Sequence, residues 1–259
     1  MTADLAVFAA LGAFGTSCIT ALTVQSTLGV RATYPIPTTI LRQTLACLAS
    51  DLPPSAVKIG MLATAENVEA VAEFIALIRQ DSPTPVVLDP VMRSSSGAQL
   101  LGQRGIEAMQ TKLLPLADWI TPNLEELGLL TNRSVANGAE MEAATAELQT
   151  RFTRLGIVAT GGHLGSADDL VCEPGKTRCW IPGSRIVSLA THGTGCAFSS
   201  AMAYSLADGM TGLDAARRAK AFVEQAISRA QPFGHGKGPM NLYWPLRETS
   251  VRCGGDGCR

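Results

Sequence analysis

The sequence lacks the features of membrane-spanning, secreted and polyanion-binding proteins. No uninterrupted apolar run reaches the roughly 18 residues that a membrane span requires. The N-terminus has no basic start and carries Asp4 inside its apolar stretch, unlike a signal peptide. The 21 basic and 22 acidic residues leave a formal net charge of -1, and no basic run could follow a nucleic-acid backbone. We therefore expect a cytoplasmic protein with no membrane partner and no nucleic-acid partner.

The cysteines lack the spacing of a disulfide framework. Their number is odd, seven in 259 residues, so we expect reduced thiols. Cys18 and Cys47 lie in apolar contexts and are predicted to be small core residues. Cys253 and Cys258 have the spacing of half a metal site, but no second pair or histidine accompanies them. We therefore predict a flexible tail over residues 247–259.

Hydrophobic residues are plentiful and follow two alternating patterns. They make up 46% of the chain, enough for the core of one domain, which we place at residues 1–246. Apolar β-rich runs alternate with segments of helical period, which predicts an α/β fold with three αβα layers and a mostly parallel central sheet. The predicted strands are 17–24, 56–59, 86–88, 119–120 and 157–159, and the predicted helices between them are 38–49, 65–78, 106–114 and 139–155. A hairpin of 170–172 with 178–180, a helix after Gly195 and a helix over 213–230 complete the expected elements.

The chain begins with a predicted helix rather than a strand. Residues 2–11 have a capping residue and two apolar residues at helical spacing, and Gly12 ends the segment. A parallel βα architecture normally begins with a strand, and ligands bind at the turn after it. We therefore expect one part of the binding site to be missing at this end.

The run from Thr191 to Cys196 is the most informative segment for function. Gly193 and Gly195 allow a turn that brings successive backbone N–H groups together, and the following helix presents its unpaired N–H groups and positive dipole end. Such a corner, built around Thr194, binds phosphate. At this helix start we expect the dipole to lower the pKa of Cys196 and make it a base or nucleophile. The alternative is a glycine-rich loop that caps an ordinary helix.

Polar and glycine residues follow five of the predicted strands where each strand ends. Because the carboxyl ends of strands in an α/β sheet carry the functional loops, we expect these residues to converge on the phosphate corner. Carboxylates such as Asp89 and Glu126 suit Mg²⁺, which takes oxygen ligands and substrate phosphates. The residues are Gln25, Gly60, Met61, Asp89, Asn123, Glu126, Thr160, Gly161 and Gly162.

Each of these residues also has a purely structural interpretation. Asp89 before a proline is typical of a turn, and Asn123 with Glu126 is typical of a helix cap. Met61 suits a core position, and Gln25 suits a solvated strand end. The turn that begins at Thr160 is equally compatible with a plain connection.

Eight segments in one order resemble a known enzyme family over about residues 3–244. The sequence is similar to the hydroxymethylpyrimidine and phosphomethylpyrimidine kinases of thiamine biosynthesis, which belong to the ribokinase-like superfamily. The matching segments are ALGAFG (10–15), TALTVQST (20–27), KIGML (58–62), DPVM (89–92), TPNLEE (121–126), GGH (161–163), HGTGC (192–196) and GKGPMN (236–241).

The resemblance implies a ribokinase-like fold and an enzyme that uses ATP and Mg²⁺ to phosphorylate 4-amino-5-hydroxymethyl-2-methylpyrimidine and then its monophosphate. Relatives of this kind are commonly homodimers. The implied roles are as follows: Gln25, Thr23, Met61, Val91 and His192 bind the pyrimidine; Gly193, Thr194, Gly195 and Cys196 form the catalytic corner; Asn123, Thr160 and Gly162 bind the nucleotide; and Asp89 and Glu126 hold Mg²⁺.

The sequence departs from the family pattern at two places that bear on function. The match starts after the first strand and its glycine-rich loop, and Thr160 stands where relatives often carry lysine. Cys196 is shared with certain pyridoxal kinases, whereas many superfamily members have aspartate there. Two alternatives therefore remain open: a pyridoxal or pyridoxine kinase, and a catalytically impaired remnant that binds ligand without turnover.

Overall fold

The structure is a computed structural model that describes residues 1–80, 82–94, 97–162 and 164–246. The predicted tail over 247–259, with Cys253 and Cys258, lies outside the described residues, as does His163 of the GGH segment. Among the described helices, none is long and apolar enough to cross a membrane.

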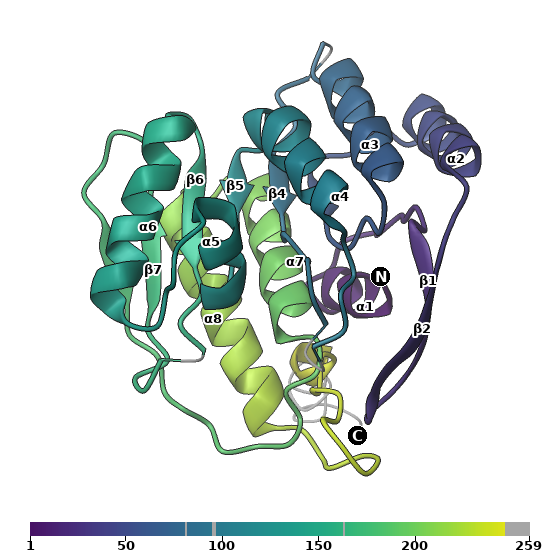
Figure 1. Ribbon diagram of the computed structural model, residues 1–259. Helices are drawn as coiled ribbons and strands as arrows, with labels where there is room; N and C mark the ends of the chain where they lie inside the picture. Colours follow the sequence, from purple (N-terminus) through teal and green to yellow (C-terminus); the bar gives the residue numbers. More distant parts are fainter. Residues whose placement is uncertain (81, 95–96, 163, 247–259) are drawn as a thin grey trace, which may run out of the picture.

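A six-stranded sheet forms the centre of the molecule (Figure 1). The first four strands along it pair in parallel, and the last two pair antiparallel as a hairpin. The short apolar runs predicted this arrangement, because parallel strands are covered on both faces and need no polar alternation. In spatial order the strands are β3 (Val57–Ile59), β4 (Val86–Leu88), β5 (Trp119–Ile120), β6 (Gly156–Ala159), β7 (Asp169–Cys172) and β8 (Cys179–Ile181).

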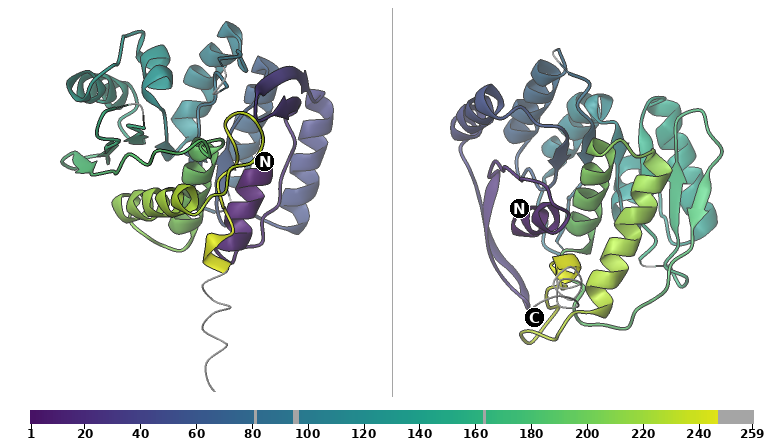
Figure 2. Two further views of the ribbon diagram at one scale, coloured as in Figure 1. Left: turned by 90° about the horizontal axis from the view of Figure 1, so that it is seen from below. Right: turned by 180° about the vertical axis from the view of Figure 1, so that it is seen from behind.

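Helices cover both faces of this sheet, which confirms the predicted three layers. Val86 and Leu88 point into one hydrophobic core, and Val87 between them points into the other. The first core is covered by α3 (Ala65–Ile78), α4 (Gln103–Ala108), α5 (Leu124–Thr131) and α6 (Gly138–Arg151), with α2 (Thr38–Asp51) at its edge. The second core is covered by α1 (Thr2–Ala10), α7 (Thr194–Ala207) and α8 (Gly212–Ser228), seen together in the right-hand view of Figure 2.

The prediction of a buried sheet strand at 17–24 is wrong. The segment instead contributes β1 (Ala21–Ser26), which pairs antiparallel with β2 (Gly29–Pro35) in a separate two-stranded sheet. This hairpin stands beside the central sheet in Figure 1, and most of its side chains are exposed. Leu22 and Val24 alternate with polar residues in β1, and such alternation is typical of a half-solvated antiparallel strand rather than of a buried parallel one.

Three smaller predictions also need correction. The predicted helix 106–114 is α4 continued by one π turn (Met109–Leu113) and a 3₁₀ turn (Leu114–Leu116), where Pro115 removes a backbone donor. The helix expected at 139–155 ends at Arg151. Cys47 is exposed on α2 and does not lie in the core as predicted, whereas Cys18 is partly buried and packs against the core.

The tip of the β1–β2 hairpin packs on the loop that follows α8. The backbone N–H of His235 donates to Thr27 Oγ1 at 3.3 Å. Gly234 and Gly236 lie so close to Thr27 that a Cβ at either position would overlap it. Farther along this loop, Gly238 pairs with Leu189 and His192. The loop therefore contacts the hairpin at one end and the segment before α7 at the other.

Candidate active site

The segment before α7 has the geometry of an anion-binding corner. Gly193 is the residue before the helix and has a φ of +83°, in the left-handed region that favours glycine. No side chain caps this helix, so its first N–H groups are left for a ligand. The His192 N–H donates to the Gly238 carbonyl at 3.0 Å, which fixes the direction of entry into the helix. Gly193, Thr194 and Gly195 thus form the corner that the sequence predicts.

A single cleft of about 2020 Å³ opens in front of this corner. It brings together all the predicted site residues except Asp89, which is 4% exposed and lies beneath the cleft rather than along its wall. The predicted residues that line the cleft are Thr23, Gln25, Met61, Val91, Asn123, Glu126, Thr160, Gly162, His192, Gly193, Thr194, Gly195 and Cys196.

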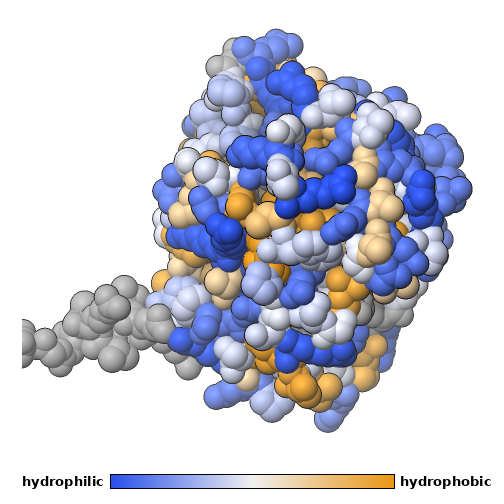
Figure 3. Space-filling model, turned by 90° about the vertical axis from the view of Figure 1, so that its left-hand side faces the viewer, coloured by the Kyte–Doolittle hydropathy of each residue, from blue (hydrophilic) through white to orange (hydrophobic). Residues whose placement is uncertain are grey.

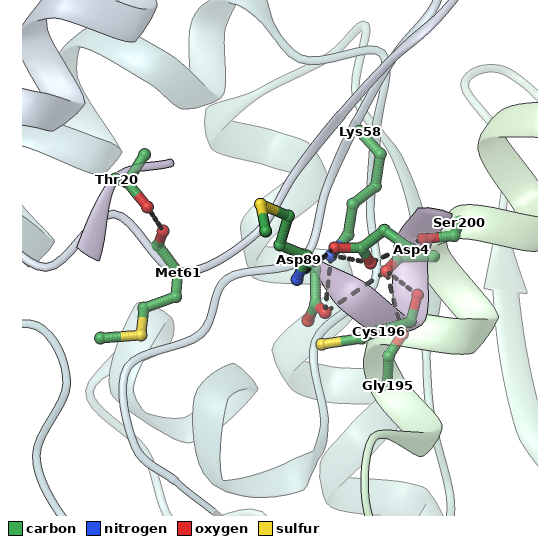
Figure 4. Close-up of polar contacts among 10 residues, drawn as sticks. Asp4, Thr20, Lys58, Met61, Asp89, Gly195, Cys196 and Ser200 are labelled. Carbon is green, nitrogen blue, oxygen red and sulfur yellow. Dashed lines mark hydrogen bonds and ion pairs between the residues drawn. The ribbon is translucent and has the colours of Figure 1, made fainter. Parts of the chain in front are cut away.

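Under the corner lies a buried ionic cluster of Asp4, Lys58 and Asp89 (Figure 4). Lys58 Nζ on β3 is 2.9 Å from Asp4 Oδ1 and 3.8 Å from Asp89 Oδ2, and the three side chains are mostly buried. Two serines of α7 complete the cluster: Ser199 donates to Asp89 at 3.3 Å and Ser200 donates to Asp4 at 2.8 Å. The cluster therefore joins α1, β3, the end of β4 and α7, and its Asp4 and Lys58 also line the cleft.

The charges of this cluster shift one another's pKa values. Burial alone would lower the pKa of Lys58, but Cys196, Asp89 and Asp4 raise it above its ordinary value. Burial raises the pKa of Asp89 more than Lys58 lowers it. For Asp4, burial acts upward, but Lys58 and the N-terminal ammonium bring its pKa below the ordinary value. Lys58 is therefore a fixed buried cation at neutral pH.

The predicted low pKa of Cys196 is wrong. Lys58 does lower the pKa of this thiol, but burial and the negative charges of Asp89 and Asp4 outweigh it and raise the pKa to about 11. Cys196 is therefore a neutral thiol at physiological pH.

Asn123 and Glu126 cap the N-terminus of α5, as the purely structural interpretation of these two residues predicted. Asn123 Oδ1 accepts from the Glu126 N–H at 3.0 Å, and Glu126 Oε2 accepts from the Asn123 N–H at 3.0 Å. Burial, followed by the nearby charge of Asp89, raises the pKa of Glu126 to about 8. Since both residues also line the cleft, the cap and a ligand-binding role are compatible.

The turn after β6 lies beside this cap. Thr160 forms a parallel bridge with Asn123, and its N–H donates to the Pro122 carbonyl at 2.9 Å. Thr160 and Gly162 thus reach the cleft next to Asn123, as the prediction of converging strand ends requires.

The β1–β2 hairpin supplies the opposite wall of the cleft. Gln25 lies within β1 rather than after a sheet strand, yet its Nε2 is 3.2 Å from His192 Nε2. At the base of the hairpin, Thr20 Oγ1 donates to the Met61 carbonyl at 2.5 Å (Figure 4). Gln25 and His192, two of the residues predicted to bind the pyrimidine, are therefore in contact, although Gln25 comes from a different element than predicted.

Sequence reasoning missed Lys58, Asp4 and the two serines of the buried cluster. One signal was present: Lys58 is a charged residue inside the apolar strand Val57–Ile59, and buried lysine occurs almost only where it is paired. Its partner Asp4 was visible only as an exception in an apolar stretch.

Three layers, an uncapped N-terminus of α7 and a cleft beside it are the architecture that this chain shares with ribokinase-like small-molecule kinases. The phosphomethylpyrimidine kinase family model matches residues 1–241, and the chain belongs to this family. A hydroxymethylpyrimidine/phosphomethylpyrimidine kinase of Streptomyces coelicolor is 38% identical over 95% of this chain and 90% of its own length.

Two solved structures extend the comparison. The phosphomethylpyrimidine kinase of Clostridium difficile has a TM-score of 0.74 at 32% identity, covering 87% of this chain and 91% of its own. The pyridoxal kinase of Staphylococcus aureus in complex with AMP-PCP and pyridoxal has a TM-score of 0.83 at 28% identity, covering 94% and 87%. The fold is thus shared by kinases named for two different vitamins.

Proposed function

We propose that the protein uses ATP to phosphorylate 4-amino-5-hydroxymethyl-2-methylpyrimidine and then its monophosphate in thiamine biosynthesis. The observation that carries this proposal is the uncapped N-terminus of α7, with Cys196 in its first turn, facing a cleft lined by Gln25 and Met61. The family and the Streptomyces coelicolor relative support the same substrate class.

In the proposed reaction, the bond between the terminal phosphorus of ATP and the bridging oxygen of ADP breaks. A new bond forms from that phosphorus to the hydroxymethyl oxygen, which loses its proton. The N–H groups of Gly193, Thr194 and Gly195 would stabilise the charge on the transferred group, since fixed donors need no reorganisation. Cys196, a neutral thiol with a pKa of about 11, would orient the acceptor hydroxyl rather than remove its proton.

For the substrates, Gln25 and His192 would hydrogen-bond the pyrimidine edge, while Met61, Val91 and the backbone at Thr23 would enclose the ring. Asn123, Thr160 and Gly162 would bind the nucleotide phosphates at the other end of the cleft. These assignments follow from the residues that line the cleft.

Mg²⁺ fits the carboxyl groups near this nucleotide end. Glu126 lines the cleft and its pKa is raised in part by Asp89 beneath it, a repulsion that a divalent cation relieves. We propose that Glu126 holds Mg²⁺, with Asp89 contributing its charge from below. When bound, the ion would neutralise charge on the phosphates.

This assignment predicts a pH-dependent affinity for Mg²⁺. Below a pKa of about 8 the Glu126 carboxyl is protonated, and the ion must displace that proton. The apparent affinity should therefore rise by up to about tenfold per unit between pH 6 and 8 and then level off. Magnesium titrations monitored by calorimetry would measure it. Glu126→Gln should abolish the dependence, whereas Glu125→Gln, its exposed neighbour, should keep it. Equal pH dependence in all three proteins would contradict the assignment.

The substrate assignment is tested by turnover of the two vitamin precursors side by side. We expect Mg²⁺-dependent ADP release with hydroxymethylpyrimidine and its monophosphate, with a kcat/KM at least about tenfold higher than with pyridoxine. A preference for pyridoxine or pyridoxal would favour the second candidate, which the Staphylococcus aureus structure supports. Nucleotide binding without turnover of any of these would favour a ligand-binding remnant.

We also propose that the protein is a homodimer that pairs through the β1–β2 hairpin. Four large apolar side chains of this hairpin are more than half exposed: Leu22, Val24, Leu28 and Tyr34. By contrast, hydrophilic residues dominate the face seen in Figure 3, and the hydrophobic ones form small separate patches there. A two-stranded sheet alone is marginally stable in water, so a partner would stabilise it.

Sedimentation velocity would measure this pairing. The wild-type protein should sediment as a dimer, and Leu22→Glu with Val24→Glu should shift it to a monomer. Leu77→Glu, an equally exposed leucine on α3, serves as the control and should leave the dimer intact. A wild-type monomer at all concentrations would contradict the proposal.

We place the enzyme in the cytoplasm. Cysteines 18, 47, 172, 179 and 196 are all free among the described residues, which supports a reducing compartment.

A further inference from the structure

Lys220 is a buried lysine on α8 at the far end of the cleft from the ionic cluster. It is 8% exposed and lies on the helix face that also buries Ala216 and Ala219. Its ammonium donates to Asp169 Oδ2 at 2.9 Å and to the Ala167 carbonyl at 2.8 Å. Burying a lysine ammonium costs free energy unless it is paired. These two contacts therefore show that Lys220 is held in a buried ion pair and is not solvated.

The partner carboxylate of Lys220 reaches the turn after β6. Asp169 Oδ1 accepts from the Gly161 N–H at 2.8 Å, so one carboxylate joins the lysine to the middle of the Thr160–Gly162 turn. A Cβ on Gly161 would overlap the Asp168 carbonyl oxygen. The turn is therefore pressed against the start of β7 and held there by Asp169.

A second loop converges on the same lysine. The Gly183 N–H donates to Asp168 Oδ1 at 2.8 Å, and a Cβ on Gly183 would lie 2.7 Å from Lys220 Nζ. Ala167, which accepts from Lys220, has a φ of +56°, a conformation that non-glycine residues adopt at a cost. Lys220 thus binds the residues at the start of β7 directly and reaches the turn after β6 through Asp169, while Gly183 after β8 packs close beside it and is held by Asp168.

We propose that Lys220, acting through Asp169, is a positioning residue that sets the nucleotide affinity of the Thr160–Gly162 turn. The proposal rests on the proposed kinase function, in which Thr160 and Gly162 bind ATP phosphates. Backbone N–H groups bind phosphate only when the turn orients them toward it. Lys220 fixes the orientation of this turn because it holds Asp169, which accepts from the Gly161 N–H. The pyrimidine end of the cleft has no contact with this pair in the described residues, so its affinity should not depend on Lys220.

The test compares Lys220→Met with Arg217→Met, a control on the same helix whose exposed side chain pairs only loosely with Asp214 at 3.4 Å. Lys220→Met should raise the KM for ATP by about tenfold or more and leave the KM for the pyrimidine within about twofold. The dissociation constant of a fluorescent ATP analogue, measured without pyrimidine, should rise by a similar factor. The control should match the wild type in both measurements.

A second variant keeps the proposal testable where Lys220→Met does not fold. Asp169→Asn retains an acceptor for Gly161 but removes the charge that holds Lys220, so it should weaken analogue binding to an intermediate degree. Wild-type analogue binding by a folded Lys220→Met or Asp169→Asn variant would overturn the proposal, as would an equal rise in both KM values. If the wild type binds the analogue but turns over no pyrimidine, the proposed function fails while the binding comparison still decides the role of Lys220.

Discussion

Replacing Cys196 with alanine is expected to lower kcat by about 100-fold or more, with small changes in the KM values. The thiol lies in the first turn of α7 beside Asp89, where it would orient the acceptor hydroxyl against the phosphate corner. Because its pKa is about 11, it acts as a neutral hydrogen-bonding group at pH 7. Cys196→Ser retains such a group and should keep more activity than Cys196→Ala.

Steady-state kinetics between pH 6.5 and 9.5 would separate this role from that of a thiolate base. A thiolate base would make kcat rise by about tenfold per pH unit across this range, because the ionised fraction grows toward a pKa of about 11. We expect no such rise. Cys47→Ala, which changes an exposed cysteine on α2, is the matched control and should behave as the wild type.

Replacing Lys58 with methionine is expected to destabilise the fold by about 3–5 kcal/mol. The change leaves Asp89 buried without its cation and leaves Asp4 with one of its two cations, the N-terminal ammonium at 2.8 Å. A buried charge that loses its partner is among the costliest defects in a protein core. Equilibrium unfolding in urea at pH 7 would measure the difference. Asp4→Asn in the Lys58→Met background removes one of the two remaining negative charges and should recover part of the loss.

Lys112→Met provides the comparison for this loss. Lys112 lies 2.7 Å from Glu69, yet both side chains are at least 40% exposed. An exposed pair contributes at most about 1 kcal/mol, so this variant should unfold close to the wild type. Equal losses in the two lysine variants would show that burial of the Lys58 cluster does not determine its contribution.

Local sequence signals were enough to predict the central sheet and the glycine turn that leads into α7. Val86–Leu88 and Gly156–Ala159 are continuous apolar runs, and an unbroken run of that length in an alternating pattern specifies a buried strand. The turn before α7 requires a left-handed conformation at position 193, which glycine adopts readily. The spacing of Gly193 and Gly195 already indicated such a turn. These features depend on neighbours within a few residues.

The remaining parts depend on contacts between distant residues. Asp4 is bonded to Lys58, which is 54 residues away in the sequence, and to Ser200, which is 196 residues away. No local sequence pattern indicates either contact. The pKa of Cys196 could not be predicted either, since it is the balance of burial, two carboxylates and two cations, Lys58 and the N-terminal ammonium. β1 was assigned to the central sheet because its alternation of Leu22 and Val24 with polar residues was taken for a buried apolar run.

The loop after α8 links the β1–β2 hairpin to the segment that leads into α7. It packs on the hairpin tip at Thr27 and pairs through Gly238 with His192, so a swing of the hairpin pulls on the segment that leads into α7. If the proposed kinase function is correct, a displacement of the hairpin would be felt at the N-terminus of α7 through this loop. Substitutions at the hairpin tip should then alter the KM for the pyrimidine and the affinity for the nucleotide phosphates together.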